Sequence, residues 1–465
     1  MNIKNEYQKI KNIKLVELLF YAFPISFIIG NLILSLNLLL FIIAGFVLIK
    51  KEQLTFRFNA SYWLLITFFL YFFLSTTIQF QSPGILNEKI QNLSLENNPI
   101  FKSFILLRFL FLIIIVDTLF FNNILNLKKF FFLSFICTSF VSFDIIFQYL
   151  IGFDLFGLKS LDETRNSGPF GDEIIAGSYL QRFSLFSIFY IFVIFEKKNF
   201  NNLLLFFIIT IHLTAILLAG NKMPMLLFFL GYFFIFLILK NIRWVLVSSL
   251  VFFLIIFTVI YKNNNNYRDV YSGFFNEINF IKIINQINEQ KKQIQKVESE
   301  EYYYENVQSK VIILKTSGHA GLFRSSYKMW KDQPIFGFGL KSFRIKCWEF
   351  SPPRTEEYIK AGAVAVGCST HPHNYYLELL SESGIIGAGL IIIFFLILLK
   401  DSFYYLKKYI NTKNSEMILL IPIIIVFILE IWPIKSTGSF FTTWNATFLW
   451  LNVAILFSIK FNKSS

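Results

Sequence analysis

Two histidines, His371 and His373, flank Pro372 at the end of a long polar stretch and just before an apolar one. Thr370 is a predicted helix N-cap, and proline is tolerated in the first turn of a helix. We therefore expect His373 in the first turn of the helix that follows. The partial positive charge of a helix N-terminus disfavours imidazolium, and a general base requires neutral imidazole. His373 is the candidate for removing a proton from a hydroxyl group.

Two other interpretations of the histidine pair stay open. In the first, His371 and His373 form half of a metal site, because histidine is the commonest metal ligand in proteins. The remaining histidines are remote in sequence, since His212 lies in an apolar stretch and His319 far upstream. In the second, His373 is a purely structural capping residue.

A basic and aromatic segment, 321–331, precedes the histidines. In a helix, Arg324, Lys328 and Lys331 fall on one face at i, i+4 and i+7. The aromatic residues beside them are Phe323, Tyr327 and Trp330. Such a cationic stripe suits an anion held near lipid headgroups. The alternative is an interfacial helix whose lysines contact anionic lipid.

Two glycines and two cysteines accompany this segment. Gly337 and Gly339 allow a tight turn and a close approach of two backbones. Cys347 and Cys368 share the same long polar stretch. If that stretch lies outside the cytoplasm, where disulfides persist, a bridge would tether segment 337–344 to the residues before His371. Two free thiols are the alternative.

Several charged residues fall inside apolar stretches. Arg182 lies about two turns into one of them, and Lys222 begins another. A charge inside a bilayer is costly, so such a residue normally faces the protein interior or a watery cavity. The deeper charged residues are Arg108, Asp117, Asp144 and Glu430. For these we expect structural ion pairs, for example Arg108 with Asp117 or Asp144.

The composition indicates what must position these residues. The chain has 465 residues, of which 55% are hydrophobic and 15% charged, and its mean hydropathy is +0.58. Apolar residues fall in long blocks, and about 20 of them span a bilayer as a helix. The net charge of +14 comes mostly from short links between blocks, where it fixes membrane orientation. Nucleic-acid binding is therefore not predicted.

The sequence predicts an all-α integral membrane protein with about twelve transmembrane helices. The expected spans are 15–30, 32–49, 61–80, 101–121, 129–150, 174–195, 202–219, 223–239, 243–261, 375–399, 415–432 and 442–459. Lysine and arginine gather in the links after even-numbered spans, so both termini are expected in the cytoplasm.

This topology divides the chain into three parts. Residues 1–261 hold spans one to nine, with a short periplasmic loop at 151–173. Residues 262–374 form one large periplasmic loop between spans nine and ten, and 375–465 hold the last three spans. The segment 276–310 in the large loop has no predicted role.

The motifs resemble those of the O-antigen ligase and polymerase superfamily of bacterial envelope glycosyltransferases. His373-Asn374-Tyr375-Tyr376-Leu377, followed by Glu382-Ser383-Gly384-Ile385-Ile386-Gly387, is similar to the His-Asn-x-x-Leu and Glu-x-Gly elements of that family. Arg324, Trp330 and the 334–339 turn resemble its Arg…Trp…Pro-Leu-x-Gly-x-Gly stretch. Arg165-Asn166-Ser167-Gly168-Pro169-Phe170 resembles a shorter outer-loop element. The motif region covers about 205–395.

One position departs from the family pattern. Lys222 stands where many members carry arginine, and lysine lacks the bidentate fork that arginine offers a phosphate.

The resemblance implies transfer of a polysaccharide from undecaprenyl diphosphate to an acceptor hydroxyl, without a nucleotide sugar, a metal or another cofactor. The expected partners are the lipid-linked glycan, lipid A–core or another acceptor, and membrane lipids. His373 is the candidate base, and Arg324 would stabilise the leaving diphosphate. Further candidates for binding the diphosphate are Arg182, Lys222, Arg165 and Lys328. Structural roles are expected for Gly337, Gly339, Glu382, Gly384 and the two cysteines.

Several functions share this donor. A ligase attaches O-antigen to lipid A–core, a polymerase extends repeat units on the carrier lipid, and a protein O-oligosaccharyltransferase modifies serine or threonine. We favour the ligase, in the bacterial inner membrane, because one large outer loop suits it. A twelve-span secondary transporter would have a long central cytoplasmic link, whereas residues 196–202 form a short one.

Overall fold

The computed structural model describes most of the chain as helices joined by short turns. The described residues are 3–56, 58–81, 98–160, 164–194, 200–277, 318–351, 367–412, 414–436 and 438–461. No β-strand occurs among them. The charged segment 278–317, which includes most of 276–310, lies outside the described residues.

The helices of the N-terminal half follow the predicted apolar segments. They are α1 (Ile3–Tyr21), α2 (Phe23–Ile29), α3 (Asn31–Glu52), α4 (Ala60–Gln81), α6 (Pro99–Phe121), α7 (Leu127–Ile151), α8 (Ala176–Ile194), α9 (Phe200–Leu218), α10 (Lys222–Ile238) and α11 (Arg243–Asn263). Short 3-10 turns occur at Gly168–Phe170 and Lys240–Ile242.

The C-terminal half adds both amphipathic and apolar helices. Its elements are α12 (Asn265–Glu277), α15 (Gly318–Asp332), α16 (Phe343–Phe350), α18 (Tyr375–Thr412), a 3-10 turn at Ser415–Leu419, α19 (Leu420–Glu430) and α20 (Thr443–Phe461). The segment around Arg324, whose charges would share one face in a helix, is helical and forms α15.

The prediction of a multi-pass helical membrane protein is confirmed in its general form. Among the described residues, 8 helices are long and apolar enough to cross a membrane, or up to 9 if the bent pair of α1 and α2 is one span. Two shorter apolar helices, Lys222–Ile238 and Met417–Glu430, accompany them. The number twelve stays a prediction.

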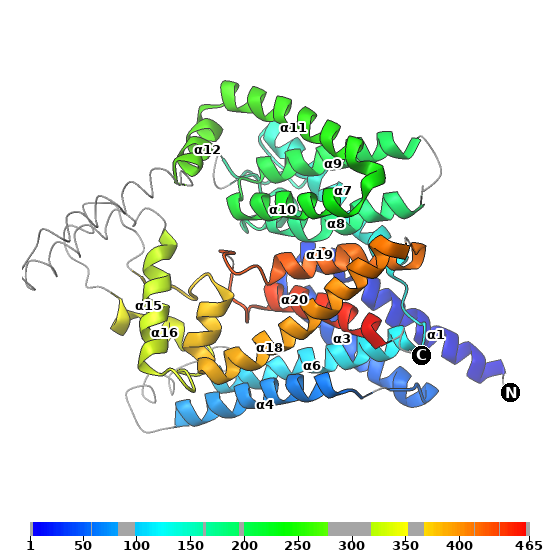
Figure 1. Cartoon of the computed structure of the whole chain (residues 1–465), viewed down its shortest axis with the longest axis vertical. Helices are drawn as coiled ribbons and strands as arrows, with labels where there is room; N and C mark the ends of the chain where they lie inside the picture. The colour runs from blue at the N-terminus through cyan, green and yellow to red at the C-terminus, as the bar shows by residue number, and fades with distance from the viewer. Residues whose placement is uncertain are drawn as a thin grey trace, which may run out of the picture.

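The bundle has two groups of helices joined by α19. In one group α7 packs against α8, and α9 packs against both α8 and α11; in the other α20 packs against α6, and α18 against α4. Figure 1 shows α19 between the groups, where it contacts α8, α10 and α20. The two chain termini lie at one end of the bundle, and α15 and α16 lie at the opposite end (Figure 1).

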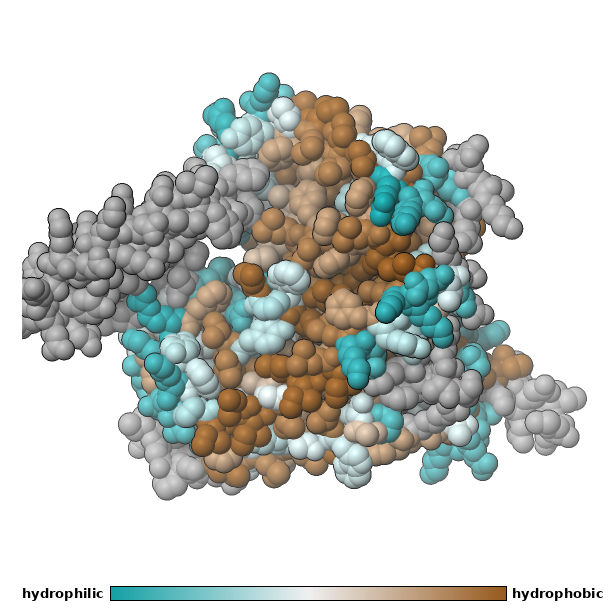
Figure 2. All heavy atoms as spheres, in the orientation of Figure 1, coloured by the Kyte–Doolittle hydropathy of each residue, from teal (hydrophilic) through white to brown (hydrophobic). Residues whose placement is uncertain are grey.

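The distribution of hydrophobic and hydrophilic side chains on the surface suits a protein embedded in a membrane. Figure 2 shows hydrophobic side chains across the middle of the molecule and hydrophilic ones toward the two ends. Leu32 on α3 is 80% exposed and Trp244 on α11 is 85% exposed. Side chains of this type are stable in contact with lipid, and each helix satisfies its own backbone hydrogen bonds there.

Aromatic packing fills the interior. Phe20 contacts the rings of Phe23, Phe41 and Phe130, and Trp450 is fully buried against Phe69. Edge-to-face and tilted ring pairs of this kind contribute about 0.5–1.5 kcal/mol beyond their buried area. The phenylalanine-rich composition thus gives a tightly packed helix bundle, which holds the elements of the site in place.

Candidate functional site

The glycine motif of the 334–339 turn and that of α18 pair with each other. The backbone amide of Phe338 donates to the carbonyl of Ser381 at 3.0 Å, and that of Gly339 donates to Glu382 at 2.8 Å. From the other side, the amide of Ile385 donates to the carbonyl of Pro334 at 2.8 Å. The 334–339 turn therefore lies along an opened turn of α18.

This opened turn requires glycine. Gly384 has φ 62° and ψ −168° inside α18, a conformation that side chains rarely tolerate. A Cβ at Gly384 would lie 2.1 Å from the carbonyl oxygen of Ile335, and one at Gly337 would lie 2.5 Å from the amide nitrogen of Gly384. Glycine is needed at both positions because the backbone of the 334–339 turn contacts the backbone of α18 there.

Glu382 fixes the start of α16. Its buried carboxylate accepts hydrogen bonds from the backbone amides of Lys341, at 2.8 Å, and Phe343, at 3.4 Å. A carboxylate near the first amides of a helix stabilises that helix. This arrangement supports a structural role for Glu382.

A disulfide joins α16 to the segment that leads to the histidines. Cys347 and Cys368 are bonded, with their Cα atoms 5.2 Å apart. Cys347 is completely buried beside Leu322 and Met329 of α15. The bridge thus ties α15, α16 and the approach to His371 into one layer.

The cationic stripe of α15 faces outward. Arg324 and Lys328 are exposed, as is Lys331, whereas the opposite face of the helix is buried. On that buried face, Ser326 Oγ donates to the carbonyl of Leu377 on α18 at 2.8 Å. The cationic side chains of the stripe are therefore exposed and lie on the face of α15 that points away from α18.

Three imidazoles gather at the beginning of α18. The ring centre of His373 lies 4.1 Å from that of His371 and 4.6 Å from that of His319. The sequence did not indicate His319 as a site residue because it lies far upstream of the other two histidines. In the structure, α15 places it beside His373. Burial lowers the pKa of His371 to about 3, assisted by the neighbouring positive charges of Lys341 and Arg344. Burial also lowers the pKa of His319.

The local geometry at His373 differs from the expected one. Asn374, not Thr370, caps α18, because its Oδ1 accepts from the amides of Tyr376 at 3.0 Å and Leu377 at 3.1 Å. Asparagine ranks above threonine as an N-cap. Thr370 instead hydrogen-bonds the His371 ring at 2.9 Å.

His373 consequently lies just before the helix, with φ 56°. A non-glycine residue in this left-handed region is uncommon, and such backbone strain concentrates at functional sites. Within the described part of the chain, no group of three or more histidine, cysteine, aspartate or glutamate side chains has the arrangement of a metal site.

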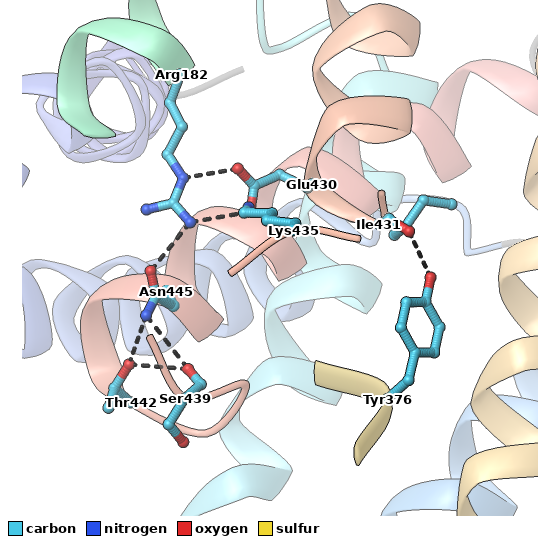
Figure 3. Close-up of polar contacts among 8 residues, drawn as sticks. All are labelled: Arg182, Tyr376, Glu430, Ile431, Lys435, Ser439, Thr442 and Asn445. Carbon is cyan, nitrogen blue, oxygen red and sulfur yellow. Dashed lines mark hydrogen bonds and ion pairs between the residues drawn. The ribbon is translucent and has the colours of Figure 1, made fainter. Parts of the chain in front are cut away.

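Arg182 is held in a buried ion pair. Its Nε and Nη2 donate to the two carboxylate oxygens of Glu430 at 2.7 and 2.9 Å, and Nη2 also donates to Asn445 Oδ1 at 3.0 Å (Figure 3). Lys435 donates to the same carboxylate at 2.9 Å. The ring of Trp444 lies 4.5 Å from the guanidinium carbon. The Glu430 carboxylate is thus paired with both Arg182 and Lys435.

This centre is linked to the histidines through the 433–435 turn. Asn374 Nδ2 donates to the carbonyl of Pro433 at 2.9 Å, and Lys435 Nζ lies 5.3 Å from the ring centre of Tyr375. Burial lowers the pKa of Lys435 to about 8, although Glu430 opposes this shift. Lys435 is a site residue that the sequence motifs did not indicate.

Lys222 and Arg165 both lie close to Gly220, beside this centre. Lys222 is the first residue of α10, and the two residues after it line a cavity of about 270 Å³ together with Arg182 and Lys435. A Cβ at Gly220 would lie 2.9 Å from Cγ of Arg165. The 164–165 segment thus contacts the turn that precedes α10.

The predicted ion pair of Arg108 is not found among the described residues. Arg108 Nη2 donates to Thr443 Oγ1 at 3.3 Å. Asp117 accepts from Tyr62 Oη at 2.5 Å, and Asp144 accepts from the amide of Leu155 at 2.8 Å. Each of these carboxylates thus accepts a hydrogen bond from a neutral donor, and the second oxygen of Asp144 is buried without a partner in the described part of the chain.

The fold and the site define a multi-pass helical membrane protein with a disulfide-bonded helical layer over one end. Residues 203–392 match the model of a family described as O-antigen ligase. The match supports the O-antigen ligase-like superfamily and confirms the resemblance predicted from the motifs. The family implies a glycosyltransferase-like enzyme of the ligase or polymerase type. A search of curated proteins gave no match.

Proposed function

We propose that the protein transfers O-antigen or a related polysaccharide from undecaprenyl diphosphate to a hydroxyl group of lipid A–core. Transfer would take place at the periplasmic face of the bacterial inner membrane, with both termini in the cytoplasm. The observation that carries the proposal is the position of His373. This strained residue lies just before the motif helix α18, and the next residue, Asn374, connects it to the cationic centre of Arg182 and Lys435.

In the proposed reaction, the His373 imidazole takes the proton of the acceptor hydroxyl. The acceptor oxygen bonds to the anomeric carbon of the donor sugar, and the bond from that carbon to the diphosphate oxygen breaks. The diphosphate leaves on its lipid with the electron pair of that bond. This reaction needs a neutral base and cations beside the leaving group, and it needs neither a metal nor a nucleotide sugar.

Arg324 is our first choice to stabilise the leaving diphosphate, with Lys328 on the same exposed stripe of α15. Arg182, Lys222 and Arg165 are the further candidates. Because Glu430 already neutralises one of the charges of Arg182 and Lys435, this centre would retain a single net positive charge for a substrate.

The test uses a deletion strain complemented with variants. His373→Asn removes the imidazole but keeps a residue that tolerates positive φ. Arg324→Gln removes the exposed charge, and Arg268→Gln on α12 is the matched control because Arg268 is also exposed. We expect His373→Asn and Arg324→Gln to lose long-chain lipopolysaccharide at normal protein level, while Arg268→Gln restores it.

The type of defect separates the alternatives. Unattached long chains on the carrier lipid identify a ligase, and lipopolysaccharide with a single repeat identifies a polymerase. Normal lipopolysaccharide with a glycoprotein defect identifies protein glycosylation. Unchanged surface polysaccharide in both His373→Asn and Arg324→Gln would show that the site is wrong.

A further inference from the structure

A second cavity lies beside the Arg182 centre and is lined by four cations. Its volume is about 420 Å³, in the usual range of small-molecule sites. Lys102 and Arg108 come from α6, and Lys341 and Arg344 come from the segment that enters α16. No carboxylate side chain lines the cavity among the described residues. None of these cations belongs to the motifs discussed above.

The four cations are placed at different depths. Lys102 and Arg108 are six residues apart on α6, which corresponds to roughly 9 Å along the helix axis. Lys341 is buried and has φ 62°, and its Nζ donates to Ser439 Oγ at 3.2 Å. The fold thus holds Lys341 in a strained conformation that directs a charge to a buried position.

The charges of this cavity are incompletely neutralised. Arg108 Nε is buried without a hydrogen-bond partner in the described part of the chain. The side chains of Lys102 and Arg344 make no hydrogen bond or ion pair with another described residue. An arginine inside a membrane helix normally requires a partner or a watery cavity, because burying its charge is costly.

Two carboxylates lie behind Lys341 but are used elsewhere. Glu378 accepts from Ser439 Oγ at 2.5 Å and from the amide of Phe440 at 2.6 Å. Glu382 accepts from the backbone amides at the start of α16. When both are counted as ionised, two positive charges still remain in excess around the cavity. This excess distinguishes it from the Arg182 cavity, where Glu173 and the paired Arg182 both line the wall.

The two cavities adjoin, since Asn31 and Thr442 line both. The four-cation cavity also has apolar walls from Ile105, Leu106 and Phe441. A ligand with a phosphoryl head and a lipid tail fits cations combined with apolar walls at the outer end of membrane helices. A small hydrated anion would gain nothing from the apolar walls.

We propose that the four-cation cavity binds the phosphoryl groups of a membrane-anchored substrate. The identity of that substrate rests on the proposed function: either the diphosphate of the lipid-linked donor or a phosphate of a phosphorylated acceptor lipid. Binding next to the Arg182 cavity would bring the ligand near the histidines, whose neighbours include Lys341 and Arg344.

Binding to the purified full-length protein tests this inference without requiring transfer. The ligands are undecaprenyl diphosphate, a phosphorylated lipid A acceptor, phosphatidylglycerol and inorganic diphosphate. The double variant Arg108→Gln/Arg344→Gln removes two charges of the cavity, and Arg108→Lys/Arg344→Lys keeps them. Arg268→Gln controls for loss of exposed charge, because α12 lies away from the residues that line the cavity.

We expect the glutamine double variant to weaken binding of undecaprenyl diphosphate or of the acceptor lipid by about tenfold or more. The lysine double variant should retain most of the affinity, and Arg268→Gln should bind like the wild type. The lipid that loses affinity identifies the source of the phosphoryl group.

Three results would overturn the inference: unchanged affinity for both substrate lipids, equal losses in Arg268→Gln, or a loss confined to phosphatidylglycerol or inorganic diphosphate. Normal binding with absent transfer would contradict the proposed function alone. Lost binding in the glutamine variant with normal transfer would contradict the link between the cavity and the reaction.

Discussion

Arg182 and Glu430 form a bidentate ion pair between α8 and α19, across a sequence separation of 248 residues. The pair joins the two helix groups of the bundle at the point where α19 ends. Lys435 shares the carboxylate, so Glu430 is the only described ion-pair partner of both cations. A single acidic residue thus stabilises two buried positive charges.

Because Glu430 pairs with both cations, we expect substitutions of Glu430 and Arg182 to reduce the stability of the protein by different amounts. Glu430→Gln leaves two buried cations unpaired, and we expect a loss of about 3–5 kcal/mol in stability, typical of a broken buried pair. Arg182→Gln should cost less, because Lys435 continues to neutralise Glu430. Thermal unfolding of both variants in detergent measures the order. A larger loss in Arg182→Gln would contradict this account.

The backbone contact at Gly384 predicts that alanine is not tolerated there. Gly384→Ala should cost on the order of 1–3 kcal/mol from backbone strain alone, and more from the contact with Ile335. Gly389→Ala in the same helix is the control, since a Cβ there meets nothing within 4 Å. The control should be neutral or slightly stabilising. Equal melting temperatures for the two variants would refute the role of Gly384.

The disulfide predicts a specific thiol count. Under denaturing conditions without reductant, only Cys137 should react with a thiol reagent, and all three cysteines should react after reduction. Mass spectrometry of the alkylated protein distinguishes these states. Cys347→Ser/Cys368→Ser should lose about 2–5 kcal/mol in stability. Three reactive thiols without reductant would disprove the bridge.

The lowered pKa of His371 predicts a loss of stability in acid. Its folded pKa of about 3 lies below the ordinary histidine value of about 6.5, so the unfolded chain binds more protons between these values. The stabilisation is complete above about pH 6.5 and decreases as the pH falls toward about 3.

His371→Gln removes this titration. Between about pH 7 and about pH 4, the melting temperature of the wild type should fall more steeply than that of His371→Gln. Parallel pH profiles would show that His371 does not titrate in this way.

The sequence could predict the membrane helices because that information is local. A continuous apolar block satisfies its own backbone and needs only lipid around it, whatever its neighbours are. For the segment at Arg324 the spacing indicated which charges would share a face in a helix, and in α15 these side chains are exposed together. The position of the N-cap was harder, because Thr370 and Asn374 are both acceptable caps; in the structure Asn374 caps α18 and also donates to the carbonyl of Pro433.

What the chain determined by itself is therefore its class, its helices and its motif residues, His373 and Arg324 among them. The tertiary structure alone decided which side chains meet. It brought His319 to His373, paired Arg182 with Glu430 and gathered Lys102, Arg108, Lys341 and Arg344 around one cavity. Apolar runs specify helices through short-range hydrogen bonds, but a charge acquires its role from partners that are distant in the sequence.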